Sequence, residues 1–390
     1  MGHAPRVPEH RSIAALVPRR HAGMRRANGM ESRSAGYHPT GFLIGRLPLL
    51  FRGGSLLPLF PGYPLERVKE RAQREEEDKR DFRCPAAWSK GCIVCEQVSL
   101  KGARMSSSTM PEILTQDIGD VDLSYLLYEG DGPTLILMHA TGFLPWLWHP
   151  IARELAPSYR VIAPYFCDHR EVEPEEGGLS WMRIAEDLAV FCSRLGIERP
   201  GLVGHSMGAT VLTLANAAFD LDAMGIILIE PIFLPQDFYK IRLKVEEHPL
   251  ASKSIRRRST WESREEALAY LRSKPLFRAW DSEMLDLYLR YGMREGDSGG
   301  LALACSPKQE ASLFMGGMLF DPWPLIPKVS CPVLVLEGEM SENREYIDLR
   351  KAVASMKNAD YRLIEGAGHL IPMEKPGEIT GMIRDFFDRR

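Results

Sequence analysis

The chain lacks a strong net charge and a long apolar run. Its 390 residues carry a formal net charge of -3, which gives no reason to expect a nucleic-acid partner. No window reaches the roughly 18 to 20 uninterrupted apolar residues of a membrane span. The closest window, residues 41–60, is broken by Arg46, Arg52, Pro48 and Pro58. With 45% apolar residues, the sequence is typical of a soluble protein, and we expect a cytoplasmic location without a membrane span.

The chain also lacks a disulfide framework. It has seven cysteines, an odd number without framework spacing, so we expect reduced thiols. Cys92 and Cys95 form one C-x-x-C pair with Cys84 close by, but a metal site needs a fourth ligand and none is near. We therefore predict no metal site and no cofactor.

Acidic residues are scarce at the start of the chain. Residues 1–65 contain nine arginines and only two acids, Glu9 and Glu31, with no helical or strand period. We predict that residues 1–110 form a disordered Arg-rich extension. An organelle transit peptide is an alternative, as is a stretch upstream of a working start at Met105 or Met110.

From Pro111 onward, apolar strands alternate with amphipathic helices, which predicts an α/β fold with a mostly parallel, doubly wound sheet. We expect the first part of this core in residues 111–230 and the second in residues 326–390, where one helix is predicted over residues 343–356. Residues 231–325 have a helical pattern and no strand of the quality found on either side. They are predicted to form an inserted helical lid.

The most informative motif is Gly204-His205-Ser206-Met207-Gly208, a G-x-S-x-G sequence between an apolar strand and a helix-forming run. An abrupt strand-to-helix turn places its middle residue in a strained conformation and exposes it above the sheet. Ser206 is therefore a candidate nucleophile at the start of a helix, where the backbone favours negative charge. A glycine-rich turn without catalytic function is the alternative interpretation.

Two further motifs follow the order expected for such a nucleophile. His-Ala-Thr-Gly-Phe stands at residues 139–143, and Gly-Ala-Gly-His stands at residues 366–369. With these three motifs, residues 111–390 resemble the α/β-hydrolase superfamily, in particular its esterase, lipase and C–C hydrolase branch with a helical cap. The resemblance implies an α/β-hydrolase fold with Ser206 as nucleophile and His369 as base. His205, next to the nucleophile, is interpreted as a packing residue.

The oxyanion hole and the acid are also assigned from the resemblance. It implies that the backbone N–H of Met207 is one oxyanion donor and that Thr141 supplies the other, with Gly142 as an alternative. The usual aspartate after the penultimate strand is absent, because Ser341 stands three residues after Gly338.

Glu230 closes a buried apolar strand, where a carboxylate is costly unless it has a function. It is the predicted acid of the triad, and Glu342 and Glu339 are the alternatives.

Other polar and aromatic groups receive structural interpretations. Asp168-His169-Arg170 is expected to fix a loop. Arg256-Arg257-Arg258 is interpreted as a solvated charge run in preference to a contact with an anionic substrate. The aromatic residues of the insertion are expected to form mainly lid core, with one or two lining an acyl pocket: Trp261, Phe277, Trp280, Tyr288 and Tyr291.

These features predict a cofactor-independent serine hydrolase that cleaves a carboxylic ester or a related small-molecule acyl substrate through an acyl-enzyme. A serine at position 206 argues against epoxide hydrolysis and dehalogenation, which use a carboxylate nucleophile. The substrate and the oligomeric state stay open. C–C bond hydrolysis and acyl transfer are the enzymatic alternatives, and a non-catalytic ligand-binding member of the fold is the alternative from another class.

Overall fold

The computed structural model describes residues 110–296 and 299–390. In this part of the chain, eight strands form one sheet in the order β1-β2-β4-β3-β5-β6-β10-β11. The strands from β4 to β11 run parallel, and β2 pairs antiparallel with both β1 and β4. The predicted mostly parallel α/β sheet is confirmed. The strands are β1 (Glu112–Asp117), β2 (Asp122–Tyr128), β3 (Thr134–Met138), β4 (Arg160–Pro164), β5 (Gly201–His205), β6 (Gly225–Ile229), β10 (Val333–Gly338) and β11 (Ala359–Ile364).

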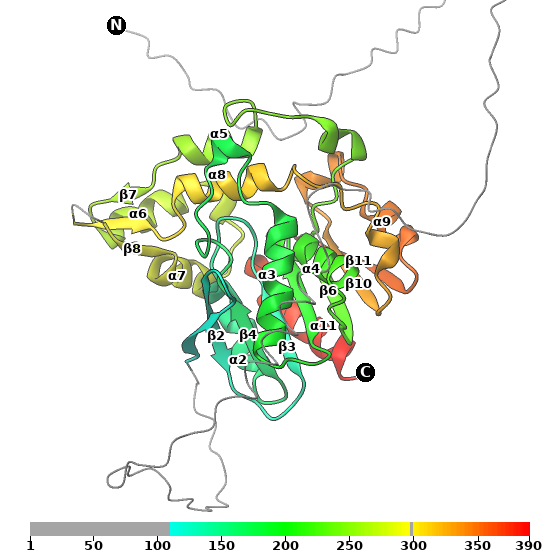
Figure 1. Cartoon of the computed structure of the whole chain (residues 1–390). Helices are drawn as coiled ribbons and strands as arrows, with labels where there is room; N and C mark the ends of the chain where they lie inside the picture. The colour runs from blue at the N-terminus through cyan, green and yellow to red at the C-terminus, as the bar shows by residue number, and fades with distance from the viewer. Residues whose placement is uncertain (1–109, 297–298) are drawn as a thin grey trace, which may run out of the picture. The chain divides into compact units, whose positions relative to one another are not determined.

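Helices cover both faces of this sheet (Figure 1). Alternate residues of a strand point to opposite faces, so Ile136 and Met138 of β3 join one apolar cluster and Leu135 and Leu137 join another. The first cluster includes α3, α4 and α9, and the second includes α2, α10 and α11. These helices are α2 (His149–Leu155), α3 (Trp181–Arg194), α4 (Met207–Ala218), α9 (Leu349–Ser355), α10 (Ile371–Glu374) and α11 (Pro376–Phe387).

Residues 231–325 leave the large sheet between β6 and β10 and contribute helices and a second, three-stranded sheet in the order β7-β9-β8. Figure 1 shows this segment, in light green to yellow, along one end of the large sheet. The sequence pattern did not indicate these strands, because each has only two or three residues. The elements are η4 (Gln236–Lys240), α5 (Pro249–Arg256), β7 (Thr260–Trp261), α6 (Arg264–Arg272), η5 (Pro275–Phe277), α7 (Ser282–Tyr291), β8 (Met293–Glu295), β9 (Leu301–Leu303) and α8 (Pro307–Gly316).

The prediction of one helix over residues 343–356 is wrong. The chain instead forms a short 3-10 helix, η7 (Glu342–Glu345), and then α9, which begins at Leu349. Asp348 separates the two, because its side chain accepts a hydrogen bond from the Lys351 N–H and caps α9. Outside the insertion, the described residues form three other 3-10 helices, η2 (Pro145–Trp148), η3 (Pro174–Glu176) and η6 (Ile326–Lys328).

Strand register brings distant parts of the sequence to one edge of the sheet. His205 at the end of β5 pairs with Ile229 at the end of β6, and Ile229 pairs with Leu336 of β10. Gly338 at the end of β10 pairs with Ile364 at the end of β11. The residues that follow β5, β6, β10 and β11 therefore meet at the carboxyl edge, where ligands bind in open α/β sheets.

Some sequence predictions fall on residues 1–109, outside the described residues: the disordered extension, the interrupted apolar window and the Cys84, Cys92 and Cys95 triplet. The four cysteines of the described chain are free thiols: Cys167, Cys192, Cys305 and Cys331. Among the helices of residues 110–296 and 299–390, none is both long enough and apolar enough to cross a bilayer.

Candidate active site

Ser206 stands at the turn between β5 and α4. Its φ of 55° and ψ of -116° lie outside the regions that non-glycine residues favour, which matches the strained turn predicted for this motif. Close packing explains both flanking glycines. A Cβ on Gly204 would come within 2.6 Å of the Ala209 backbone nitrogen, and a Cβ on Gly208 would come within 2.5 Å of the Met138 carbonyl oxygen. The elbow therefore lies directly against the end of β3.

His369 follows β11 and reaches Ser206 from the next loop. Its Nε2 lies 3.1 Å from the Ser206 Oγ, and its side chain is 28% exposed. The loop is held by backbone donors, because the Gly368 N–H bonds to Glu374 Oε2 at 2.7 Å and the Gly366 N–H bonds to Glu339 Oε2 at 2.9 Å. The imidazole is thus within hydrogen-bonding distance of the serine hydroxyl without a change in the loop.

Glu230 is the candidate acid whose carboxylate contacts His369. Its Oε2 lies 2.9 Å from His369 Nδ1, and the residue is 1% exposed. Glu339 instead accepts the Gly366 N–H, and Glu342 is exposed in the first turn of η7. The structure therefore brings Ser206, His369 and Glu230 together and leaves the two alternative acids outside this hydrogen-bonded series.

The burial of Glu230 is compensated by donors from the end of β10 and the loop after it. The Gly338 N–H donates to Oε1 at 2.7 Å, and the Ser341 hydroxyl donates to Oε2 at 2.8 Å. A buried carboxylate is tolerable only when its oxygens are paired in this way. Ser341, which occupies the position of the usual aspartate, thus contacts the carboxylate that replaces it.

Asn343 and Tyr346 were missed by sequence reasoning. The Asn343 amide lies 2.9 Å from His369 Nδ1 and 3.5 Å from Glu230 Oε2, and the Tyr346 hydroxyl donates to the Asn343 Oδ1. The Asn343 side chain therefore packs beside Nδ1 of the His369 imidazole. In the sequence, the only signal in this loop was that Ser341 stands where the usual aspartate is expected.

Two buried histidines hold the loops of the site. His205 Nε2 contacts the His369 carbonyl oxygen at 2.9 Å, and burial lowers the pKa of His205 to about 3. It is therefore neutral and tethers the loop that carries His369, in addition to packing. His139 Nε2 accepts the Phe166 N–H at 3.0 Å, and burial lowers the pKa of His139 to about 4. His139 thereby fixes the start of the loop after β3.

That loop carries the predicted second oxyanion donor. The Phe143 N–H bonds to the Ala140 carbonyl at 3.2 Å and closes a turn in which Gly142 has a φ of 76°. A glycine at this position is typical of a type II turn. Thr141 is buried in the same turn. On the other side of the elbow, α4 begins at Met207, and the N–H groups of a first helical turn have no intrahelical acceptor.

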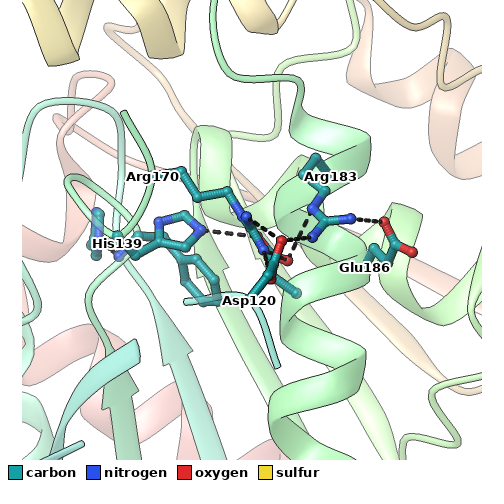
Figure 2. A network of polar contacts seen from close by, with 8 residues as sticks. Asp120, His139, Arg170, Arg183 and Glu186 are labelled. Carbon is teal, nitrogen blue, oxygen red and sulfur yellow. Dashed lines mark hydrogen bonds and ion pairs between the residues drawn. The ribbon is translucent and has the colours of Figure 1, made fainter. Parts of the chain in front are cut away.

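His169 and Arg170, after β4, fix their loop as expected. Arg170 binds Asp187 of α3 through Nε at 2.6 Å and Nη2 at 2.8 Å, and His169 Nε2 lies 3.0 Å from the same carboxylate. Figure 2 shows Arg170 and Arg183 meeting at Asp120 of the β1–β2 turn, with Glu186 on the other side of Arg183. These ion pairs hold the pKa of Asp120 down at about 2.

The aromatic residues of the insertion pack as a core, in agreement with the sequence interpretation. Trp261, Trp280 and Tyr288 are buried in one apolar cluster, with Phe277 and Tyr291 against it. The interpretation of Arg256–Arg258 as a solvated run is wrong for the middle residue. Arg257 Nη1 donates to Glu310 Oε1 at 2.9 Å, whereas Arg256 and Arg258 are exposed. At the end of α5, the side chains of Arg256 and Arg258 point to solvent, and the side chain of Arg257 between them points toward α8.

Comparison with known proteins gives a family match over most of this region. The model of the alpha/beta hydrolase family matches residues 135–380. In sequence, the chain is similar to the abhydrolase domain-containing protein ACTT2-1 of Alternaria alternata. The two are 26% identical over 222 residues, which cover 48% of this chain and 82% of that protein.

Solved structures show a similar fold. E-2-(acetamidomethylene)succinate hydrolase matches with a TM-score of 0.60 and 21% identity, covering 71% of this chain and 100% of that one. A thermophilic esterase from Thermogutta terrifontis matches with a TM-score of 0.53 and 21% identity, covering 71% and 98%. At these identities the likeness concerns the fold, since one fold serves many substrates.

Proposed function

Because the chain belongs to the alpha/beta hydrolase family, we propose that it is a serine hydrolase that cleaves a carboxylic ester or a related acyl compound. The observation that carries the proposal is the hydrogen-bonded series from Ser206 Oγ through His369 to Glu230, at 3.1 and 2.9 Å. A nucleophile, a base and an orienting carboxylate in this order are the requirements for acyl transfer at neutral pH.

In the first half of the reaction, Ser206 Oγ attacks the acyl carbon while His369 Nε2 takes the hydroxyl proton. Glu230 accepts the Nδ1 proton in a hydrogen bond, keeps the required tautomer and stabilises the imidazolium. The N–H groups of Met207 and Thr141 stabilise the negative oxygen of the tetrahedral intermediate. Its collapse breaks the ester bond, and His369 returns the proton to the leaving alkoxide.

In the second half, a water molecule attacks the acyl-enzyme and gives its proton to His369. The second tetrahedral intermediate releases the acid, and Ser206 recovers its proton from the imidazolium. In this proposal, residues 231–325 act as a lid that supplies the substrate-facing surface, because they follow β6 directly after Glu230 and precede β10.

A partitioning experiment tests the acyl-enzyme. Butyrate esters with different leaving groups are hydrolysed in water containing methanol, and the ratio of methyl butyrate to butyrate is measured. A common acyl-enzyme predicts the same ratio for every leaving group, and we expect Ser206→Ala to lower turnover by at least about 1000-fold. Direct attack of water on the ester, shown by a ratio that changes with the leaving group, would contradict the proposal.

A further inference from the structure

A partly buried ion pair of the insertion lies outside the hydrogen-bonded series of the candidate active site. Arg257 follows α5, and Glu310 belongs to the first turn of α8 and is 7% exposed. Arg257 Nη1 donates to Glu310 Oε1 at 2.9 Å. Three other polar atoms of the pair are buried without a hydrogen-bond partner in the described chain: Arg257 Nε, Arg257 Nη2 and Glu310 Oε2. The Arg257 side chain is 29% exposed, and Glu310 thus pairs with only part of its guanidinium.

The unpartnered nitrogens share one edge of the guanidinium. The Nε–H and Nη2–H groups point the same way and bind a carboxylate side-on, with one bond to each oxygen. Arg170 uses this same edge to bind Asp187, at 2.6 and 2.8 Å. In Arg257 both donors of the edge are buried and have no protein acceptor in good hydrogen-bonding geometry, with the Tyr288 hydroxyl as the neighbouring polar group. The arrangement is suited to a planar, bidentate anion.

Unpaired buried donors are costly, which argues for a function. Leaving a charged donor desolvated costs more than the net gain of an ordinary hydrogen bond. A structural ion pair would be expected to satisfy its remaining donors, as Arg170 does with Asp187 and Asp120. Buried polar groups without a hydrogen-bond partner are expected at sites where a ligand supplies the missing partner.

The pair lies against the proposed oxyanion loop. A Cβ on Gly142 would come within 2.2 Å of Glu310 Oε1, so this carboxylate packs directly on the turn that contains Thr141. The same turn follows His139, whose carbonyl lies against Gly208 of the elbow. Phe143, at the end of the turn, packs against Tyr288 with ring centroids 5.8 Å apart. Arg257 is therefore connected to Ser206 through a short series of packed groups.

Arg257 keeps its positive charge beside two groups, Glu310 and Tyr288, whose charged forms are disfavoured by burial. Burial raises the pKa of Glu310, and the charge of Arg257 opposes this rise. Burial also raises the pKa of the neighbouring Tyr288 to about 12, so its hydroxyl is neutral at pH 7. An arginine keeps its charge under all these conditions. The positive charge of Arg257 is thus the most persistent charge of the group.

We propose that Arg257 binds a carboxylate of the substrate through Nε and Nη2, so that the enzyme selects acyl compounds bearing a second, ionised carboxyl group. The inference rests on the proposed serine hydrolase function. The carboxylate belongs either to the acyl part, as in the half-ester of a dicarboxylic acid, or to the leaving group. Both sources present the same planar anion to the guanidinium.

Matched substrate pairs test this selection. Mono-p-nitrophenyl glutarate is compared with p-nitrophenyl pentanoate for the acyl part, and 4-carboxyphenyl butyrate with phenyl butyrate for the leaving group. The wild-type protein is expected to prefer the carboxylated member of one pair by about 100-fold in kcat/KM. Arg257→Gln is expected to abolish that preference, because it lowers kcat/KM for the carboxylated member much more than for the neutral member. Arg257→Lys, which keeps the charge and loses the planar fork, is expected to restore only part of it.

Arg258→Gln is the matched control, because Arg258 is adjacent in sequence but pairs with the exposed Glu266. It is expected to keep the wild-type preference. An absent preference in both pairs in the wild-type protein overturns the inference, even if Arg257→Gln does not fold. An equal loss on charged and neutral substrates in folded Arg257→Gln overturns it as well, because it indicates a structural ion pair with bound water.

Failure of the proposed function is recognised separately. Fluorophosphonate labelling of Ser206, together with turnover of the neutral esters, shows a working hydrolase whatever its preference. If Ser206 labels and neutral esters are hydrolysed, but carboxylated substrates are not preferred, the inference about Arg257 is wrong and the proposed function still holds. Without labelling or turnover of any ester, both the proposed function and the inference fail.

Discussion

At the scale of single residues, Ser206 and Glu230 share an unusual backbone. Their φ angles are 55° and 52°, and both residues follow directly after a parallel strand of the sheet. Such conformations cost about 1–3 kcal/mol each and persist where the surroundings enforce them. Here the elbow packs on β3, and the Glu230 carboxylate is held by Gly338 and Ser341. These contacts therefore enforce the unusual backbone at both residues.

We predict that Glu230→Gln lowers kcat for p-nitrophenyl butyrate by a factor of about 1000 to 10,000. Glutamine keeps the shape of the side chain but removes the charge that stabilises the imidazolium and selects its tautomer. Steady-state kinetics measures the effect, and circular dichroism confirms that the variant is folded. Glu342→Gln and Glu339→Gln are the controls, with less than about threefold change expected. Near-wild-type turnover in Glu230→Gln would exclude this carboxylate as the acid.

Short local motifs in the sequence indicated some of the residues that the structure brings together at the candidate site. Ser206 and His369 stand in short glycine-containing motifs, and Glu230 was indicated by a carboxylate at the end of an apolar strand. Ser341, Asn343 and the Arg257–Glu310 pair were not predictable in this way. Their partners lie far along the chain: Ser341 is 111 residues from Glu230, and Arg257 is 53 residues from Glu310. The periodicity of one helix or strand contains no information about such distant pairs.

At the scale of elements, α5 and α8 pack together and bring Arg257 next to Glu310. The start of α5 is capped by a histidine. His248 Nδ1 accepts the N–H groups of Leu250 and Ala251, both at 3.2 Å, so the imidazole must be neutral at Nδ1. Burial lowers the pKa of His248 to about 4. This cap therefore links the stability of the insertion to pH.

We predict that His248→Asn changes the pH dependence of stability. In the unfolded chain a histidine has a pKa of about 6.5, so as pH falls below that value the unfolded state takes up a proton that the folded state refuses. Wild-type stability is lost through this group from about pH 6.5 down to about pH 4. Asparagine keeps a capping oxygen and does not titrate. Equal stability is expected at pH 7.5, and the variant should be more stable by about 1–2 kcal/mol at pH 5.

Urea unfolding followed by tryptophan fluorescence at the two pH values measures this difference. Ser180→Asn is the control, because Ser180 caps α3 with a hydroxyl that accepts the Met182 N–H and has no titration in this range. The difference in free energy of unfolding between Ser180→Asn and the wild-type protein should be the same at both pH values. A pH-independent difference for His248→Asn would show that the histidine cap does not titrate as described.

The central strands could be predicted from the sequence, because the pattern and length of their apolar runs are sufficient to identify them. The central strands are buried along almost their whole length and read as continuous apolar runs. The segment after β10 was predicted as one helix over residues 343–356, whereas the Asp348 cap starts a new helix at Leu349. A local side-chain hydrogen bond overrode the period.

At the scale of the whole molecule, the described core is built from β1 onward. The two apolar clusters that cover the faces of the large sheet contain residues from Leu114 to Phe387 of the described chain. Residues 1–65 have nine arginines and no apolar period, so they offer little surface to bury. The hydrolase core is therefore expected to fold without them.

We predict that a chain beginning at Met105 keeps its thermal unfolding midpoint within about 2 °C of the full-length value, because no apolar surface of the described core is removed. Differential scanning calorimetry measures the midpoint, and p-nitrophenyl butyrate hydrolysis measures the site. A midpoint lowered by more than about 5 °C, or loss of turnover in soluble protein, would show that the preceding residues stabilise the core.

The overall architecture was predictable because the alternation of strands and helices along the chain indicated a parallel sheet. Three glycine-containing motifs marked the edge where the candidate site lies. Which side chains of residues 231–325 face that edge depends on helix rotation and on the small sheet of β7, β8 and β9. Those relations arise from tertiary packing, so substrate selectivity needed the structure.

Active-site labelling is a direct test of whether Ser206 is a nucleophile activated by His369 and Glu230. The folded wild-type protein is treated with a fluorophosphonate, and the modified peptide is identified by mass spectrometry. We expect one adduct per chain on Ser206, absent in Ser206→Ala and in heat-unfolded protein. Folded protein that fails to label, or that labels on a different residue, would contradict it.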